Sequence, residues 1–224
     1  MVWDNREVET ADIGTGVYSF PEASQILRSS GDPVSSRQLR YWLSRGLAST
    51  FSDSEGSYRL LTFKDLISLE VVRRLKKHGA SLQAIRYLNE RLKNEFEYDS
   101  PFAYEIFFTD GASIWAQVDD DPHRAIELVG RRRGHFVWRD VITSFAKQIQ
   151  WSEEKPRVAE SWRISSWVEI DPRIQFGAPV VLGTRIPILT IKSNLDLGSP
   201  EEVAEWYGIA TEAVEGVRQY LVSA

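Results

Sequence analysis

The sequence predicts a mainly α-helical protein with small β elements, for three reasons. Apolar residues recur at three- and four-residue spacing through much of the chain. Hydroxyl residues stand where several of these helical patterns begin, as N-caps do. Short β-rich runs with Gly and Pro turns fill the intervals. We expect a winged helix-turn-helix module over residues 17–99, a middle region with a β-hairpin, a helix and a linker over 100–159, and a C-terminal domain of helix-turn-helix outline over 160–224.

The N-terminal module is expected to begin with two helices joined by a turn. The first follows Ser19, which lies three residues before Glu22 at capping-box spacing. The second follows Ser35, at the same spacing from Gln38, and ends near Gly46. Helical spacing predicts a buried face for the second helix, formed by Leu39, Trp42 and Leu43. Its opposite face then carries Arg37, Arg40, Tyr41 and Ser44.

The segment after the second helix, which ends in Gly-Ser-Tyr-Arg between apolar residues, is typical of a β-wing. A helix followed by a wing is suited to DNA, since the helix enters the major groove and the wing clamps phosphates. An arginine fork donates two hydrogen bonds to phosphate or guanine. A solvated basic helix face is the alternative interpretation. The candidate DNA-binding residues are Ser35, Ser36, Arg37, Arg40, Tyr41, Tyr58 and Arg59.

The remainder of the chain shows further periodic segments. Thr62 is expected to cap a helix over 63–77, and Ser81 to open another. Residues 102–118 resemble a β-hairpin around Asp110-Gly111. The apolar spacing predicts a helix over 139–150, followed by a polar linker over 151–161.

The C-terminal segment is expected to begin with short β segments and turns. Ser199-Pro-Glu-Glu202 then combines an N-cap, a proline in the first turn and a glutamate at the third position. Helices over 200–207 and 212–222, separated by Gly208, give a second helix-turn-helix outline. Residues 193–224 hold six acidic residues and one basic residue, so partner binding or packing is better supported there than DNA binding.

Composition narrows the class of protein. The 224 residues contain no cysteine, which excludes disulfides and fits a reducing cytoplasm. We find no run of 18 apolar residues and no signal-peptide core, so we expect a cytoplasmic protein without a membrane partner. Residues 17–95 carry 13 Lys and Arg against 8 Asp and Glu, a net charge of +5, whereas the rest carries 14 against 24, a net charge of −10. This division suggests two surfaces with two partners.

No pattern in the sequence indicates catalysis, a metal site or a cofactor. Asp119, Asp120 and Asp121 are adjacent, and adjacent side chains diverge, whereas a metal needs converging ligands. The three histidines are scattered, and none forms an i, i+4 pair. We find no credible nucleophile–base pair. We therefore expect a protein that is not an enzyme.

Residues 18–95 resemble the MerR-type winged-helix family. The resemblance is carried by QLRYWLSRGL, SYRLLTFKDL and LKKHGASLQAI, and it covers about a third of the chain. It implies DNA contacts from Arg37, Arg40, Tyr41 and Arg59. The family's long dimerisation helix is not matched here, since the helical pattern stops near Asp99.

Residues 168–222 are similar to a domain family of formally unknown function seen in VapB-like antitoxins, through VEIDPRIQFGAPVVLGTRIPI and GSPEEVAEWYGI. With both ends in one chain, the resemblance implies an antitoxin that neutralises a PIN-like ribonuclease toxin and represses its own operon by binding operator DNA. We expect a homodimer, because symmetric half-sites extend the specificity of a short reading helix. Candidate partner contacts are Arg185, Trp206 and Tyr207. The alternative is a regulator that senses a small apolar ligand.

Overall fold

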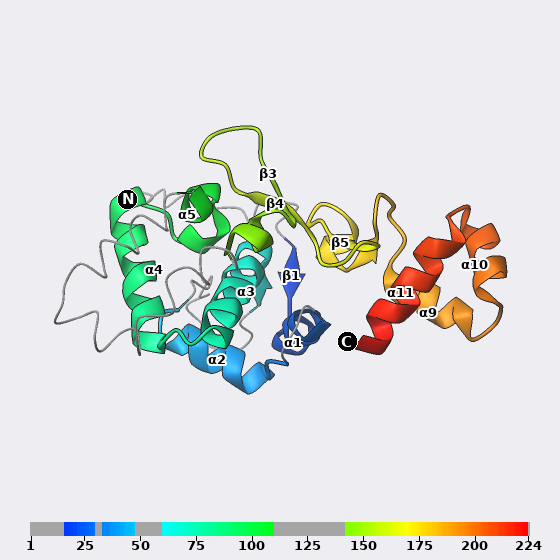
Figure 1. Cartoon of the computed structure of the whole chain (residues 1–224), viewed down its shortest axis with the longest axis horizontal. Helices are drawn as coiled ribbons and strands as arrows, with labels where there is room; N and C mark the ends of the chain where they lie inside the picture. The colour runs from blue at the N-terminus through cyan, green and yellow to red at the C-terminus, as the bar shows by residue number, and fades with distance from the viewer. Residues whose placement is uncertain (1–15, 30–32, 48–59, 110–141, 224) are drawn as a thin grey trace, which may run out of the picture.

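The protein is seen here in a computed structural model that describes residues 16–29, 33–47, 60–109 and 142–223. Mainly helical structure with small sheets confirms the predicted fold class. In Figure 1 the N-terminal helices lie at one end and the C-terminal helices at the other, with the strands β3 to β5 between them. Among the described residues, hydrophobic side chains form two cores, one mostly from the N-terminal half and one from the C-terminal helices together with Val168 and Val181.

The N-terminal module packs helices around a two-stranded antiparallel sheet. Val17 pairs with Thr62 and Tyr18 pairs with Leu61, so the strand that precedes α3 returns to the start of the module. Its elements are β1 (Val17–Tyr18), α1 (Phe20–Ser29), α2 (Ser36–Ser44), β2 (Leu61–Thr62), α3 (Phe63–Lys77) and α4 (Leu82–Phe96).

The helix starts follow the predicted caps. The Ser19 backbone N–H donates to Glu22 Oε2 at 2.7 Å before α1. At α3, Thr62 and Asp65 form a complete capping box, and at α4 the Ser81 side chain accepts from the backbone N–H of Ala84. These short polar motifs satisfy backbone donors that a helix start leaves open, so they are readable from the sequence.

The predicted hairpin over 102–118 is wrong in its first strand. Residues Pro101–Ala103 form a 3-10 turn (η1), and α5 spans Glu105–Thr109. Proline favours a helical first turn. The Phe102 and Phe107 rings, with centroids 4.8 Å apart, are both buried in the core, which decides against an alternating strand. The remainder of the predicted hairpin, including Asp110-Gly111, lies outside the described residues.

Two expectations for 139–161 are corrected. Among the described residues of this range, helical structure covers 142–146, and Ile149 already belongs to a strand, while 139–141 lie outside the described residues. The expected linker over 151–161 is instead part of a β-hairpin. Residues 149–151 pair with 159–162, and this pairing places Trp162 in the core. The resulting four-stranded antiparallel sheet has the order β3 (Ile149–Trp151), β4 (Ala159–Arg163), β5 (Val168–Ile170) and β6 (Val180–Val181). This sheet crosses the boundary expected at 159/160.

The C-terminal helices are α9 (Ile188–Leu195), α10 (Pro200–Tyr207) and α11 (Thr211–Ser223). The last two confirm the predicted pair, with a complete Ser199–Glu202 capping box and Gly208 at φ 62°. The sequence interpretation missed α9. Ile188 and Ile191 of α9 are buried, one helical turn apart, so packing on α10 and α11 supplies what the local sequence signal lacked.

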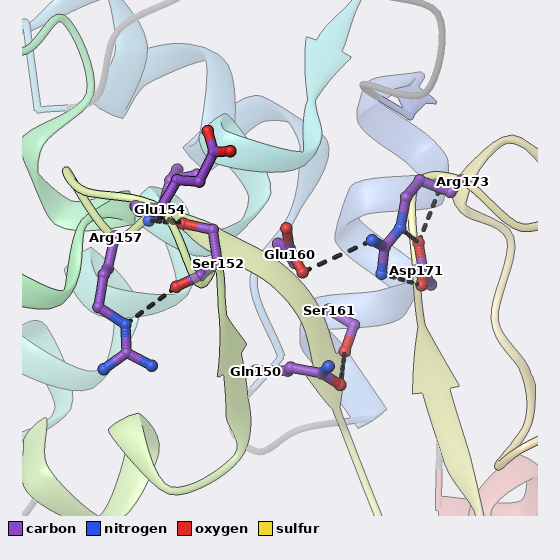
Figure 2. Close-up of polar contacts among 9 residues, drawn as sticks. Gln150, Ser152, Glu154, Arg157, Glu160, Ser161, Asp171 and Arg173 are labelled. Atoms are coloured by element: carbon purple, nitrogen blue, oxygen red, sulfur yellow. Dashed lines mark hydrogen bonds and ion pairs between the residues drawn. The ribbon is translucent and has the colours of Figure 1, made fainter.

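Polar contacts connect the sheet and the two ends of the chain. The Tyr18 hydroxyl of β1 donates to the Gly177 carbonyl at 3.0 Å. Figure 2 shows Arg173 between Asp171 and Glu160, with its Nη2 2.8 Å from Asp171 Oδ2 and its Nη1 3.5 Å from Glu160 Oε2. Burial raises the pKa of the Asp171 carboxyl, but hydrogen bonds from Arg173 outweigh it and leave that pKa below its usual value. Within the described part of the chain, we find no helix long and apolar enough to cross a membrane.

Candidate nucleic-acid interface

Helix α2 divides into a buried face and an exposed face. Leu39, Trp42 and Leu43 are buried in the N-terminal core, which confirms the predicted apolar face. The Asn89 side-chain amide of α4 donates to the Gly46 carbonyl at 3.0 Å, and Gly46 has a φ of 69°. The packed face and this bond fix the orientation of α2 relative to the rest of the module.

The exposed face of α2 carries the predicted cations. Arg37, Arg40 and Tyr41 are exposed, Tyr41 by 45%, and their i, i+3, i+4 spacing places them on one side of the helix. The Arg40 guanidinium carbon lies 4.6 Å from the centre of the Phe20 ring of α1. This cation–π contact holds Arg40 in place without neutralising its charge.

Arg45 is a further cation of this face that the sequence interpretation did not name. It is the C-cap residue of α2, and its guanidinium carbon lies 5.2 Å from the centre of the Tyr41 ring. The sequence could have indicated Arg45, because it lies four residues after Tyr41 and residues i and i+4 are neighbours on a helix surface.

The N-terminus of α2 suits an anion. Ser35 is the N-cap, and its hydroxyl accepts from the Gln38 backbone N–H at 3.2 Å. The Gln38 half of the predicted capping box is not among the contacts of the described residues. Ser36 is the first helical residue, and no acidic residue occupies the first turn. The positive end of the helix dipole is therefore not offset by a carboxylate there. Tyr58 and Arg59, predicted for the wing, lie outside the described residues.

Buried charge in α3 links the helices to the sheet. Glu70 is fully buried and pairs with Arg73 and Arg74, each at 2.6 Å. Arg74 Nη2 also donates to Gln148 Oε1 at 3.1 Å, and its guanidinium lies 4.3 Å from the centre of the Phe145 ring. These arginines are structural, so they are not available to nucleic acid.

The C-terminal candidates do not form one cluster. Trp206 of α10 is 53% exposed, whereas Tyr207 packs against the C-terminal core and its hydroxyl accepts from the Asn194 amide at 2.9 Å. Arg185 is exposed in the turn between β6 and α9, and its charge helps to lower the pKa of Asp171. The Trp206 ring is thus exposed at the surface of α10, while Tyr207 stabilises its own domain.

Asp65 is a second buried acid of α3, beside Glu70. Burial raises the pKa of its carboxyl to about 6, against the opposing effect of hydrogen bonds from Thr62. It accepts from the Thr62 backbone N–H and hydroxyl, both at 2.8 Å, so its role is to cap α3. In the described ranges we find no group of three His, Asp or Glu side chains placed to hold a metal ion.

Family comparisons assign a domain to each end of the chain. Residues 18–92 match the family described as MerR HTH family regulatory protein. Residues 168–220 match the family described as protein of unknown function (DUF433). The first range runs from the second residue of β1 through most of α4, and the second holds β5, β6, α9, α10 and most of α11. The N-terminal part of the chain is therefore similar to a MerR-type helix-turn-helix domain, and the C-terminal part is similar to a DUF433 domain.

Similar proteins come from mycobacteria. "Uncharacterized HTH-type transcriptional regulator Mb1861" of Mycobacterium bovis and Rv1830, of the same description, from Mycobacterium tuberculosis are each 34% identical over 101 residues. The match covers 44% of this chain and 42% of each relative, so it spans about two fifths of the relatives' length. The crystal structure of Rv2018 from Mycobacterium tuberculosis has a similar fold, with a TM-score of 0.71 at 22% identity, covering 89% of this chain and 95% of that one.

Proposed function

We propose that the protein is a transcription regulator that binds operator DNA through α2. The observation that carries this proposal is the exposed cationic face of a helix whose opposite face is packed. Arg37, Arg40 and Arg45 present donors on one side of α2, and no acidic residue precedes them in its first turn. Arginine suits both phosphate and the guanine edge, so this face can contribute affinity and specificity.

The relatives support this proposal, since those described above are named transcriptional regulators with the same type of domain. The proposal is tested by selecting duplexes from a random library with the whole protein and then titrating the selected duplex over a range of salt concentrations. Arg37→Ala and Arg45→Ala should each weaken binding and reduce the salt slope by about one. Arg86→Ala on α4, exposed and within the same module, is the matched control. Equal affinity in all variants would reject α2 as the reading helix.

We further propose that the protein is the antitoxin of a PIN-like ribonuclease and represses its own operon as a homodimer. Support comes from the resemblance of the C-terminal domain to domains seen in VapB-like antitoxins, and from the acidic and aromatic side chains exposed on α10. Trp206 is exposed there among Glu201, Glu202 and Glu205, which are exposed too. A ribonuclease needs a basic channel for its substrate, so an acidic surface with an aromatic anchor is complementary to it.

The antitoxin proposal is tested by co-expressing the whole chain with the product of the adjacent gene. The two proteins should purify together, and Trp206→Ala should weaken the complex without unfolding the chain. Leu197→Ala, another exposed apolar residue of this domain, is the control for non-specific loss. Light scattering of the free protein tests the homodimer. An adjacent product that is not a ribonuclease, or that does not bind, would contradict the antitoxin role and leave the DNA-binding proposal standing.

A further inference from the structure

An apolar pocket of about 250 Å³ lies between the helix-turn-helix domain and the C-terminal domain. Its walls come from β1 and α1 on one side and from η2 (Gln175–Gly177), α9 and α11 on the other. The apolar lining includes Val17, Ile26, Phe176, Pro179, Leu189 and Leu221. We propose that this pocket binds a small neutral aromatic compound and that its occupancy is transmitted through α1 to α2. The binding step is independent of the proposed DNA-binding function, whereas the use of the signal rests on it.

The lining determines the class of ligand. The volume is too small for a peptide helix and suits a compound the size of a bicyclic aromatic. Glu22 at the pocket accepts from the Ser19 backbone N–H and hydroxyl, both at 2.7 Å, so its carboxylate stays with the cap of α1 and disfavours an anion. The exposed side-chain amides of Gln25 and Gln175 offer neutral hydrogen bonds at the pocket. A neutral ring with one polar substituent fits these groups.

The backbone of the turn that carries Phe176 is strained, and its conformation places the Phe176 ring at the pocket. Gln175 and Phe176 have φ angles of 50° and 56°, in the left-handed region that residues other than glycine rarely adopt. The turn is held by the Tyr18 hydroxyl on the Gly177 carbonyl and by the Gln175 amide on the Arg185 carbonyl at 3.2 Å. The result is a phenylalanine that is 88% exposed at the pocket. Strained residues that survive because their surroundings fix them occur at ligand clamps, and a bound ring would cover Phe176.

Helix α1 connects the pocket to the reading helix. Glu22, Gln25 and Ile26 of α1 line the pocket. Phe20 of the same helix lies under the Arg40 guanidinium of α2 at 4.6 Å. Helix α1 also packs on α2 and has residues in contact with α11, whose C-terminal end faces α1 in Figure 1. A ligand that moves or stiffens α1 therefore acts on the Phe20 ring, which contacts the candidate DNA-binding residue Arg40.

Binding is tested with 1-naphthol, a neutral fluorescent bicyclic aromatic with one polar substituent, and the whole protein, without DNA. We expect saturable binding of one probe per chain. Phe176→Ala and Leu189→Ala should each weaken it about tenfold, and both positions are exposed, so folding is preserved. Leu197→Ala is the matched control for Leu189→Ala, because both are exposed leucines of the C-terminal domain and Leu197 is not among the pocket residues. Equal probe affinity in all three variants would overturn the site.

Transmission is tested by hydrogen–deuterium exchange with and without saturating probe. Slower exchange in both α1 and α2 of the parent, lost in Phe176→Ala, supports the coupling. Protection confined to the pocket turn and α9 would overturn it. Neither measurement uses DNA, so these results stand apart from those of the operator titrations. A change in affinity for the selected duplex at saturating probe then completes the case for regulation.

Discussion

Helices α2 and α10 are built alike and carry opposite charge. Each follows a serine N-cap, packs one face on its own core and exposes an aromatic side chain, Tyr41 on α2 and Trp206 on α10. Around Tyr41 stand arginines, whereas around Trp206 stand glutamates. A helix-turn-helix outline therefore does not by its shape specify a partner. The sign of the charge around the exposed ring distinguishes a surface suited to phosphate from one that repels it.

The largest expected effect separates a buried tryptophan from an exposed one. Trp42 is 2% exposed in the core behind α2, so Trp42→Ala should lower the free energy of unfolding by about 3–5 kcal/mol. Trp206→Ala should change it far less, because the ring stays half in water. Urea denaturation of both variants measures the difference. Similar losses would show that the two helices are not divided into core and partner faces as described.

The next effect concerns the contact between the two domains. Gly177 has a φ of 86°, and a Cβ there would collide with the Tyr18 hydroxyl. Gly177→Ala should therefore destabilise the protein by about 2–3 kcal/mol, from backbone strain and overpacking together. Gly208→Ala, at φ 62° with open space around it, isolates the strain and should cost about 1 kcal/mol. Equal melting temperatures for the two variants would argue against a tight Tyr18–Gly177 contact.

Arg40→Ala on α2 and Arg218→Ala on α11 compare the contributions of the two surfaces to DNA affinity. Arg40→Ala removes one cation from α2 and its contact with Phe20, so DNA affinity should fall by about 1–3 kcal/mol and the salt slope by about one. Arg218→Ala removes a cation from α11, in the acidic domain, and should leave DNA binding unchanged. Titrations over a range of salt measure both quantities. A comparable loss for Arg218→Ala would place DNA on the C-terminal domain as well.

The smallest effect compares two capping boxes. Asp65 is buried and its pKa is raised to about 6, whereas Glu202 in the box of α10 is exposed. A raised carboxyl pKa means that the folded state binds the proton more tightly. The free energy of unfolding should therefore fall by about 1–2 kcal/mol as pH rises from 4 through 6. Asp65→Asn should flatten this part of the stability profile, and Glu202→Gln is the control. Denaturation at several pH values tests it, and an unchanged slope in Asp65→Asn would exclude Asp65 as its source.

The elements that could be predicted from the sequence are those whose signals are local. The caps at Ser19, Thr62, Ser81 and Ser199 satisfy backbone donors within one turn, and the apolar face of α2 repeats at the helix period. The difference in net charge between residues 17–95 and the rest of the chain could also be predicted, because it needs only a count of charged residues. The exposure of Arg37, Arg40 and Tyr41 could be predicted too, because these residues lie opposite the apolar face of α2.

Other elements depend on contacts between distant parts of the chain and could not be predicted from local patterns. Residues 149–163 became a hairpin because their strands pair with each other and with β5, and 105–109 became helical because the aromatic rings there pack into the N-terminal core. Tertiary packing also buried Tyr207, left Trp206 exposed and brought α1 beside η2 and α11 to form the pocket. No local pattern encodes which residues far apart in sequence will meet, since burial depends on the whole packed chain.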